Sequence, residues 1–496
     1  MDPEITRRGM MKALVVAAAT GTVGSAATAA EAAQRVPATQ VYDAIILGAG
    51  TAGLVAAVEA YDQGIKPVVL EKMDLPSGNT IYALGSLNAC CTRMQKQAGI
   101  ADSKDELFAD MMKISAGQAD PTLTRTYVEH IGDDVDWLQD TIGVTFLKLQ
   151  KLPYPRLGRI HRVDGGSITG GGKLIRLLLA ACKKRNIPIL YNTKAVELIT
   201  DKKMAVTGVR ALTEDGLVEF MARGGVIIAT GGFSANREML CSYMGGATSR
   251  LALRGSPYLT GENISLTKPV FAKLVHLDQF HAGPIVSATH ANPADALNSG
   301  YGIIVDVRGK RIIDEANTYV AKARALPSLT PENMAYQLVD SSWTAVRKMV
   351  DKFTHLNTRF YQDDTVEGLA KKAGLPVEAV VASVKGYNDA VKSGRLKDLN
   401  PPCTYKNPFA MDKSPFYAFP FEGGITATFG GPKINANAQV VTWEDRPIKG
   451  LYAAGNAAGG LFFSDYIGGS QLGAATVFGR IASRHIAKVC KKNKKV

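Results

Sequence analysis

Two apolar runs that end in glycine stand at opposite ends of the chain. Near the start, residues 41–46 have the composition of a short buried strand, and a glycine loop at 48–53, an apolar helix and a second strand at 67–70 follow. Near the end, an apolar run at 450–456 precedes a glycine-rich helix start. The pattern predicts that both ends build one nucleotide site and that the middle forms a second domain over the ligand.

The glycine loop has the spacing that a dinucleotide site needs. Gly48 permits a tight turn from strand to helix, Gly50 lets the backbone approach a pyrophosphate, and Gly53 lets the helix pack closely on the strand. The helix N-terminus then faces the phosphates. Glu71, 18 residues after Gly53, can accept hydrogen bonds from a ribose 2′-hydroxyl. On this pattern alone, an ordinary strand–helix–strand turn without a ligand remains the alternative.

The middle of the chain alternates helical and strand patterns, which fits an α/β fold. Small residues at 77–80 and 83–88 form a loop where the backbone can approach a flat ring. The predicted helices cover residues 104–116, 123–141 and 174–182, and the predicted strands lie around 187–191, 193–198, 205–212 and 225–229.

Composition indicates a large enzyme without a metal site. The 496 residues, 46% apolar and 21% charged, correspond to about two or three domains. The six cysteines lack the spacing of an attached haem or a thiolate metal site, so any haem partner must be a separate chain. The net charge of +13 and a lysine-rich tail at 489–496, expected to be disordered, could steer an acidic electron-transfer protein or anionic lipid. No aromatic-interleaved basic motif suggests nucleic acid.

The N-terminus has the features of an export signal. Arg7 and Arg8 precede an Ala/Val/Gly run to about Ala30, with small residues where a signal peptidase would cut. This pattern predicts a twin-arginine (Tat) signal over residues 1–32 and a periplasmic or extracytoplasmic protein. A transmembrane anchor is the alternative, but the run is short and rich in Gly, Ala and Thr. An exported enzyme lacks cytoplasmic NAD(P)H, so its electrons should pass through a membrane or periplasmic carrier.

Several motifs in their order resemble the FAD-dependent fumarate reductase/succinate dehydrogenase flavoprotein family, which includes 3-ketosteroid dehydrogenases and exported ene-reductases. The resemblance runs from Tyr42 to about Lys488 and includes GAGTAG, SGNT, ALGSLNA, ATGGF, TGEN and GLYAAGN. It implies a Rossmann-like FAD-binding domain built from residues 41–276 and 425–488, with an inserted α+β capping domain over 277–424. Membrane-bound members attach FAD through a histidine after the glycine loop; none lies between Tyr42 and Glu129, so noncovalent FAD is expected.

The resemblance also assigns the cofactor contacts. With the motif glycines, the residues expected to bind FAD are Gly48, Gly50, Ala52, Gly53, Glu71, Lys72, Ser77, Asn79, Thr80, Gly85, Ser86, Val196, Gly231, Glu262, Gly455, Asn456, Gln471 and Leu472.

The expected substrate site departs from that of fumarate reductases. His281 resembles the family histidine that contacts substrate, but Tyr319 and Tyr466 stand where the family has arginines, and Thr426 stands where it has a histidine. Two residues of the family's proton relay appear as Ala296 and Ser299. A dicarboxylate would lack its counter-charges, so fumarate is not the expected substrate.

The two tyrosines suggest different chemistry on the same flavin. Hydride moves between flavin N5 and a substrate carbon while a proton moves at the adjacent carbon, so one acid/base is needed. Tyr319 is the candidate for this proton, and Tyr466 with His281 would hold the substrate's carbonyl end. This arrangement is similar to 3-ketosteroid dehydrogenases.

The sequence therefore predicts an enzyme that reduces or forms a C=C bond next to a carbonyl. The substrate would be an enone, an unsaturated acid or a ketosteroid, and a separate c-type cytochrome or quinone-linked carrier would exchange electrons with it. A ketosteroid-type dehydrogenase running in the oxidative direction is one alternative. A non-catalytic flavin electron-transfer subunit is another.

Overall fold

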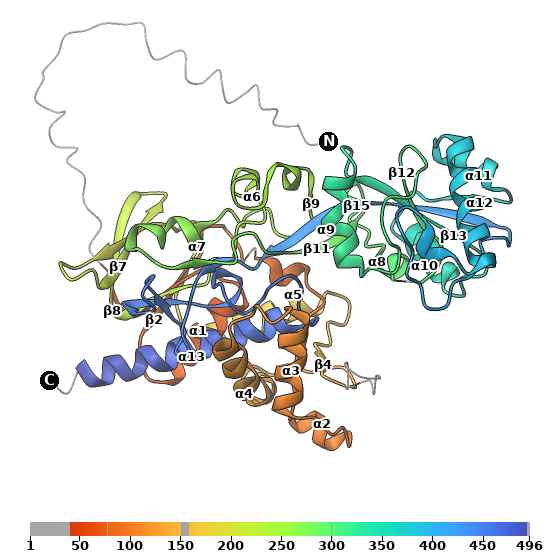
Figure 1. Cartoon of the computed structure of the whole chain (residues 1–496). Coiled ribbons are helices and arrows are strands. Elements are labelled where there is room, and N and C mark those ends of the chain that lie inside the picture. The colour runs from red at the N-terminus through yellow and green to blue at the C-terminus, as the bar shows by residue number, and fades with distance from the viewer. Residues whose placement is uncertain (1–39, 77, 150–157, 299, 494–496) are drawn as a thin grey trace, which may run out of the picture. The chain divides into compact units, whose positions relative to one another are not determined.

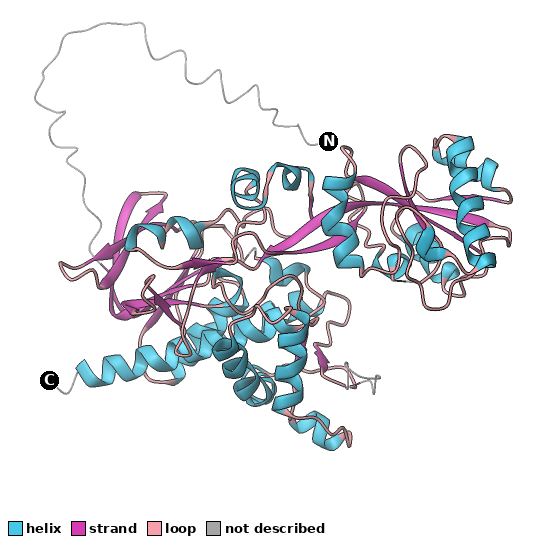
Figure 2. Cartoon of the chain, in the orientation of Figure 1, coloured by secondary structure: helices cyan, strands magenta, loops and turns pink. Residues whose placement is uncertain are grey.

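The computed structural model describes residues 40–76, 78–149, 158–298 and 300–493. The predicted export signal, Ser77 and Ser299 lie outside these ranges. Figure 2 shows the strands of two main sheets and the helices that pack on them. Among the described residues, no helix combines the length and the apolar character needed to cross a membrane.

The first sheet joins the two ends of the chain. Its strand order is β17–β18–β8–β1–β2–β5, with β7 also paired to β8 and β6 paired to β7. Ile228, at the end of β8, is in register with Leu47 of β1 on one side and with Ala453 of β18 on the other. The strands are β1 (Gln40–Leu47), β2 (Pro67–Leu70), β5 (Ile189–Leu190), β6 (Lys194–Thr200), β7 (Val206–Thr213), β8 (Gly216–Ile228), β17 (Gln439–Val441) and β18 (Pro447–Ala453).

Helices cover this sheet, and the first and last of them pack on each other (Figure 1). Several helices begin after a Ser, Thr or Asp whose side chain caps the N-terminus: Ser103 caps α3, Asp120 caps α4 and Thr169 caps α5. The helices outside residues 277–424 are α1 (Thr51–Asp62), α2 (Arg93–Gln97), α3 (Lys104–Ile114), α4 (Pro121–Trp137), α5 (Gly170–Lys184), α6 (Arg237–Met244), α7 (Glu262–Ser265) and α13 (Ser470–Asn493).

A buried ion network joins the first and last helices. Arg480 of α13 donates to Glu59 of α1 at 2.8 Å and also pairs with Asp134 of α4, while Arg484 donates to Glu59 at 2.7 Å. The Arg480 guanidinium lies over the ring of Trp137. Burial works against charge at both carboxyls, but the two arginines hold the pKa of Glu59 below its ordinary value. The network therefore fixes the C-terminal helix against the glycine-loop helix.

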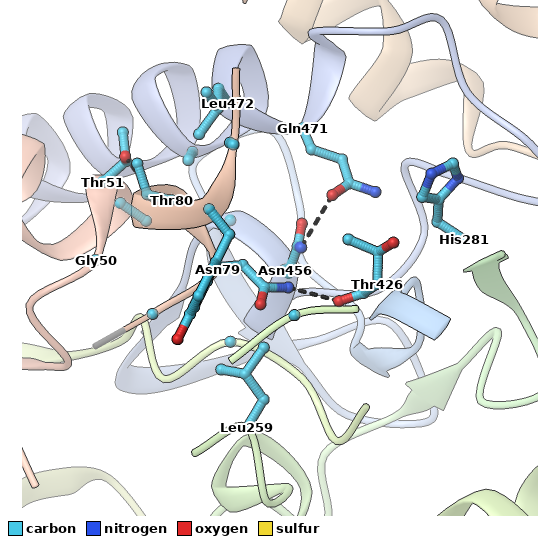
Figure 3. Close-up of a pocket in the computed structure, with 18 of the residues that line it drawn as sticks. Gly50, Thr51, Asn79, Thr80, Leu259, His281, Thr426, Asn456, Gln471 and Leu472 are labelled. Carbon is cyan, nitrogen blue, oxygen red and sulfur yellow. Dashed lines mark hydrogen bonds between the residues drawn. The ribbon is translucent and has the colours of Figure 1, made fainter. Parts of the chain in front are cut away.

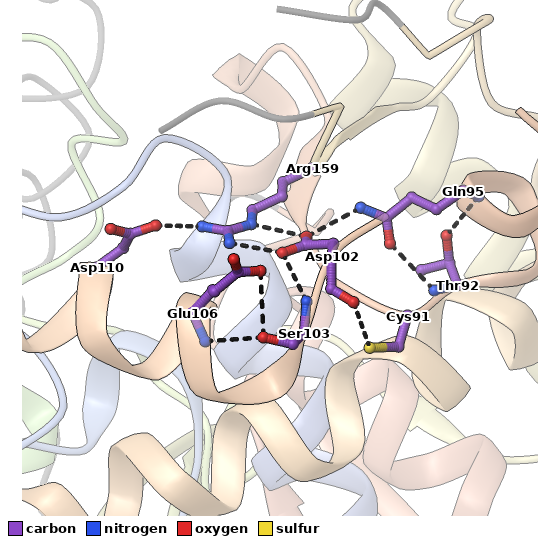
Figure 4. Close-up of polar contacts among 8 residues, drawn as sticks. All are labelled: Cys91, Thr92, Gln95, Asp102, Ser103, Glu106, Asp110 and Arg159. Atoms are coloured by element: carbon purple, nitrogen blue, oxygen red, sulfur yellow. Dashed lines mark hydrogen bonds and ion pairs between the residues drawn. The ribbon is translucent and has the colours of Figure 1, made fainter. Parts of the chain in front are cut away.

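A second buried cation, Arg159, binds two aspartates (Figure 4). Arg159 is fully buried and binds Asp102 through Nε and Nη2, at 2.7 and 2.6 Å, and Asp110 through Nη1. It directly precedes β4 (Ile160–Arg162), which pairs with β3 (Ser86–Asn88). Asp102 precedes Ser103, the N-cap of α3, and Asp110 lies within α3, so this ion cluster places β3 and the preceding Gly85 relative to the helical layer.

Residues 277–424 contain most of a second, antiparallel sheet of order β11–β15–β13–β12 with its own apolar core. The long strand β15 runs beside β11 and continues past the predicted boundary at 424, and β9, from before residue 277, pairs with it (Figure 1). The elements are β9 (Ala252–Leu253), β11 (Phe280–Ile285), β12 (Ile303–Asp306), β13 (Met334–Asp340), β14 (Tyr361–Asp363), β15 (Phe416–Thr428), α8 (Ala294–Leu297), α9 (Tyr319–Leu329), α10 (Val346–His355), α11 (Val366–Ala373) and α12 (Val377–Ser393). Two short strands, β10 (Leu274–Val275) and β16 (Gly431–Pro432), lie just outside this segment in sequence and pair with each other.

The α/β prediction is confirmed, with local differences. The helix predicted over 174–182 begins earlier, at Gly170, because Thr169 caps it there. The helix predicted to reach 141 changes at Leu138 into a π-helical turn that ends at Gly143, in the left-handed region. The expectation of a disordered tail from 489 is wrong for its first part, because α13 continues to Asn493.

Replacing Arg480 with methionine tests the ion network. The buried carboxyl of Asp134 would lose its cation, so the free energy of unfolding should fall by about 3–5 kcal/mol in urea denaturation. Arg347→Met is the matched control, because that side chain is 89% exposed and its nearest carboxylate is 3.9 Å away. The control should change the free energy by less than about 0.5 kcal/mol. Equal effects would show that the network is not a main contact between the helices.

Candidate functional site

One large cavity extends from the glycine loop to the second sheet. Its volume is about 1640 Å³, whereas pockets for a single small ligand span about 300–1000 Å³. Its wall includes residues from the start of the chain, from the segment 277–424 and from the C-terminal part. The cavity is therefore large enough for a dinucleotide and a substrate together.

Most of the predicted cofactor residues line this cavity. They are Gly48, Gly50, Ala52, Glu71, Lys72, Asn79, Thr80, Gly85, Ser86, Gly231, Glu262, Gly455, Asn456, Gln471 and Leu472. Gly53 does not line it; a Cβ there would lie 1.9 Å from the carbonyl oxygen of Gly48, as its predicted packing role requires. Val196 also is not in the wall, where its neighbour Ala195 lies instead, and Ser77 is outside the described residues.

The glycine loop leaves open space where a phosphate would lie. Gly48 has a φ of +106°, a conformation that favours glycine, and makes the turn from β1 into α1. Gly50 caps α1, and a Cβ built on it would meet no protein atom within 4 Å. The unpaired N–H groups of the first helical turn start at this point. The loop therefore has the form of a pyrophosphate cradle.

Acidic side chains flank the cradle. Glu71 accepts hydrogen bonds from the backbone N–H of Ala49 at 2.8 Å and of Met73 at 3.1 Å, and burial raises the pKa of its carboxyl. Glu262 lies in the wall and accepts from Lys72 Nζ at 2.8 Å. Burial opposes its charge, but the Lys72 ammonium holds the pKa of Glu262 below its ordinary value. Its Oε2 is buried without a hydrogen-bond partner among the described residues, as expected of an acceptor that faces a ligand.

Amide side chains line the central part of the cavity (Figure 3). Asn79 donates to the carbonyl of Thr426 at 2.7 Å and accepts from the N–H of Ser256 at 2.7 Å. Its side chain therefore joins three segments of the wall. Asn456 donates to Gln471 Oε1 at 3.1 Å, while Gln471 Nε2 is buried and finds no partner in the described part of the chain.

Tyr319, Tyr466 and His281 line the far part of the same cavity. Tyr466 comes from the C-terminal part of the chain, and its ring lies edge-on to His281, with centroids 4.9 Å apart. Tyr319 is the first residue of α9, capped by Thr318, and its N–H donates to Asn298 Oδ1 at 3.2 Å. The fold thus brings together three residues that are far apart in the sequence.

Burial keeps two of these groups uncharged. It lowers the pKa of His281 to about 3, with smaller contributions from Arg254 and Arg324, so the imidazole is neutral at physiological pH. Its Nδ1 is buried and has no partner within the described structure. Burial also raises the pKa of Tyr466 well above its ordinary value. This end of the cavity therefore offers neutral hydrogen-bonding groups.

A family model described as an FAD binding domain matches residues 43–476. The chain belongs to this FAD-binding family. It is 30% identical over 459 residues to the cytochrome fumarate reductase of Shewanella frigidimarina, which covers 91% of this chain and 78% of that protein. It is also 30% identical over 465 residues to the NADH:fumarate oxidoreductase of Klebsiella pneumoniae, but spans 49% of that protein's length.

Solved structures of this FAD-binding family have the same fold. An open conformation of a flavocytochrome c3 fumarate reductase has a TM-score of 0.79 at 28% identity, over 94% of this chain and 82% of that one. The 3-ketosteroid-Δ4-(5α)-dehydrogenase of Rhodococcus jostii RHA1, in complex with 4-androstene-3,17-dione, has a TM-score of 0.72 at 25% identity, over 92% and 99%. The predicted family and its FAD cofactor are confirmed, and the chain is an FAD-dependent oxidoreductase.

The residues present fit FAD. The open space at Gly50 would hold the pyrophosphate. Glu71 and Glu262 would hold the ribose and the neighbouring groups of FAD. The buried Nε2 of Gln471 and Oε2 of Glu262 lack partners among the described residues, and a bound flavin nucleotide offers both acceptors and donors to them. Asn79 bonds to the protein through both ends of its amide, which holds the side chain in the cavity wall.

Sequence reasoning missed Arg254. It lies in the cavity wall and donates from Nη1 to Thr426 Oγ1 at 2.9 Å. Burial lowers the pKa of this guanidinium, while Tyr319 and Tyr466 act in the opposite direction. A single arginine in an irregular loop has no periodic signal, and only the pairing of β9 with β15 brings it to the site.

Gly50→Ala tests the cradle. The φ of −76° suits alanine and no protein atom obstructs the methyl group, so the fold should remain while the methyl group occupies the phosphate space. The purified variant should contain less FAD per chain than the wild type, measured by flavin absorbance after denaturation. Gly386→Ala, in α12 with equally open surroundings, is the control and should retain full FAD. Full FAD in both variants would contradict the assignment.

Proposed function

We propose that this protein is a flavin-dependent reductase that adds hydrogen across a C=C bond next to a carbonyl or carboxyl group. The observation that carries the proposal is the convergence of Tyr319, Tyr466 and His281 on the cavity that also contains the FAD cradle. Residues 277–424 would act as the cap over the substrate. Noncovalent attachment of FAD, expected from the sequence, is part of the proposal.

FAD held in this cavity would, in its reduced form, supply the hydride for one carbon of the double bond. Tyr319 donates its phenolic proton to the adjacent carbon, so that one hydride and one proton complete the saturated product. Tyr319 stands at the start of α9, where Thr318 caps the helix and Asn298 Oδ1 accepts from the Tyr319 N–H, and these contacts fix the backbone from which the phenol projects. Solvent returns a proton to Tyr319 after product release.

Tyr466 and His281 would hold the polar end of the substrate. The phenol of Tyr466 stays protonated because burial raises its pKa, so it can donate a hydrogen bond to a substrate oxygen as negative charge develops there. The neutral imidazole of His281 packs against the Tyr466 ring and offers its unpartnered Nδ1 to the cavity. These contacts would polarise the double bond toward hydride addition.

The opposite direction is the second candidate. The similarity to a 3-ketosteroid dehydrogenase and the two tyrosines in the cavity favour an enzyme that removes hydrogen from a ketosteroid-type substrate. Tyr319 would then accept the proton. A non-catalytic flavin subunit would need neither tyrosine.

Tyr319→Phe separates catalysis from flavin binding. Without the phenolic proton, reoxidation of the anaerobically photoreduced enzyme by its best acceptor should slow by about 10²- to 10⁴-fold. Fumarate, urocanate, a cinnamate-type acid and a 3-ketosteroid enone are the acceptors to compare. FAD content should be unchanged, and Tyr61→Phe, an exposed position on α1, should behave as the wild type. An unaffected rate in Tyr319→Phe would support a non-catalytic subunit, and rapid turnover of fumarate would contradict our account of the lost arginines.

We also propose export by the Tat route, with a separate c-type cytochrome or quinone-linked carrier as electron partner. The twin arginines Arg7 and Arg8 support it, as does the similarity to a cytochrome-linked fumarate reductase. Replacing both arginines with lysine should shift the protein from the periplasmic to the cytoplasmic fraction, measured by immunoblotting in a bacterium with a Tat system. The unchanged chain and a cytoplasmic marker enzyme are the controls, and equal export of both forms would exclude this signal.

A further inference from the structure

Arg254 is a partly buried cation whose side chain lies against two glycines. Gly283 of β11 and Gly424 of β15 are register partners, and both lie against the arginine side chain. A Cβ on Gly283 would lie 1.8 Å from Arg254 Nη1, and one on Gly424 would lie 2.6 Å from its Cδ. Any larger residue at either position would displace the guanidinium. The paired glycines therefore leave the space that the arginine occupies.

Several buried arginines in the described structure have carboxylate partners, and Arg254 does not. Arg159 pairs with two aspartates, Arg311 with Glu315 and Arg480 with two carboxylates. Among the described residues, the Arg254 side chain has no ion pair and donates a hydrogen bond only to Thr426 Oγ1. A guanidinium has five N–H donors, so most of its donors are left for the cavity.

The other cations of the cavity wall differ from Arg254. Lys72 and Lys194 lie close to Glu262 at the cofactor end, and Lys148 and Arg162 are exposed to solvent. Arg324, behind His281, is satisfied by the backbone carbonyls of Phe280 and Ser464. Of the cations in the described wall, Arg254 alone is partly buried without an anion and interacts with Tyr319 and Tyr466.

We propose that Arg254, oriented by Thr426, binds the carboxylate of the substrate and restricts the site to 2-enoic acids with one negative charge. The inference rests on the proposed function and names its substrate class. One guanidinium balances one carboxylate, since His281 is neutral and the two tyrosines carry no positive charge. A second carboxylate would have no counter-charge and would lie in a cavity whose wall already includes Asp465. A neutral enone or ketosteroid would leave the guanidinium without an anion.

The test compares probes that differ in charge and little in shape. Crotonate, crotonamide and fumarate are titrated into the oxidised holoenzyme, and binding is followed by the change in the flavin absorption spectrum, which needs no turnover. The wild type should bind crotonate more tightly than crotonamide or fumarate. Arg254→Gln should weaken crotonate binding by at least about 30-fold, because a charged pair in a desolvated site is lost. Crotonamide binding should change little.

Three further variants complete the test. Arg254→Lys should retain part of the affinity for crotonate, since the charge remains but the fork geometry is lost. Thr426→Val keeps the cation and should weaken crotonate binding by a smaller factor. Arg347→Gln removes an exposed charge of the same sign and should have no effect. Should Arg254→Gln fail to fold, crotonate and crotonamide binding by Arg254→Lys and Thr426→Val still tests the inference.

Two results would overturn the inference. One is equal binding of crotonate and crotonamide, or no binding of either, in the wild type. The other is an equal loss for both probes in Arg254→Gln or, where only the other variants fold, in Thr426→Val; this would mean that Arg254 acts on the tyrosines and not on the substrate. The proposed function fails separately, if no acceptor reoxidises the photoreduced flavin. Charge-selective binding of crotonate without turnover would support the anion site while contradicting the reductase.

Discussion

The parallel pairing of β8 with β1 on one side and β18 on the other is the constraint on which the site depends. Because Ile228 is in register with both Leu47 and Ala453, the two strands end level with each other, and the loops that follow them meet at one edge of the sheet. Ligands of open α/β sheets bind at this carboxyl edge. Arg480 adds a second connection behind it by holding α13 against α1. The cofactor cradle and the residues after Gly455 are therefore positioned by the same sheet.

Two clusters of buried charge in the described structure are neutralised locally, and Arg254 in the cavity wall differs from them. The clusters around Arg159 and Arg480 each place carboxylates within hydrogen-bond distance of a guanidinium, as the cost of burying an isolated charge requires. At the substrate end, Arg254 donates to a hydroxyl and has no carboxylate partner among the described residues. A cation without an anion is costly to bury, and an anionic ligand would remove that cost. This supports the proposal of an anionic substrate.

Local sequence carries the cofactor half of the site and only part of the substrate half. Gly48, Gly50 and Glu71 follow from one strand–loop–helix unit, in which the chemistry depends on neighbours in the chain, and all three line the cavity. Tyr319 and Tyr466 were found only through their motif positions. Arg254 could not be found this way, because its role depends on Gly283 and Gly424 in two other strands. The bonds of Asn79 to Thr426 and Ser256 could not be predicted for the same reason, since those partners lie 347 and 177 residues away, respectively.

The proposed role of Arg254 also links the charge of the substrate to the direction of the reaction, because its guanidinium interacts with Tyr319 and Tyr466. With a neutral substrate, the guanidinium would favour a phenolate beside it, and Tyr319 would act as a base that removes a proton. With a bound carboxylate, the guanidinium would be neutralised, and Tyr319 would act as a protonated acid. A reductase needs the second state, and a dehydrogenase needs the first. The same residue that selects a monoanionic substrate would thus keep the proton on the tyrosine that must donate it.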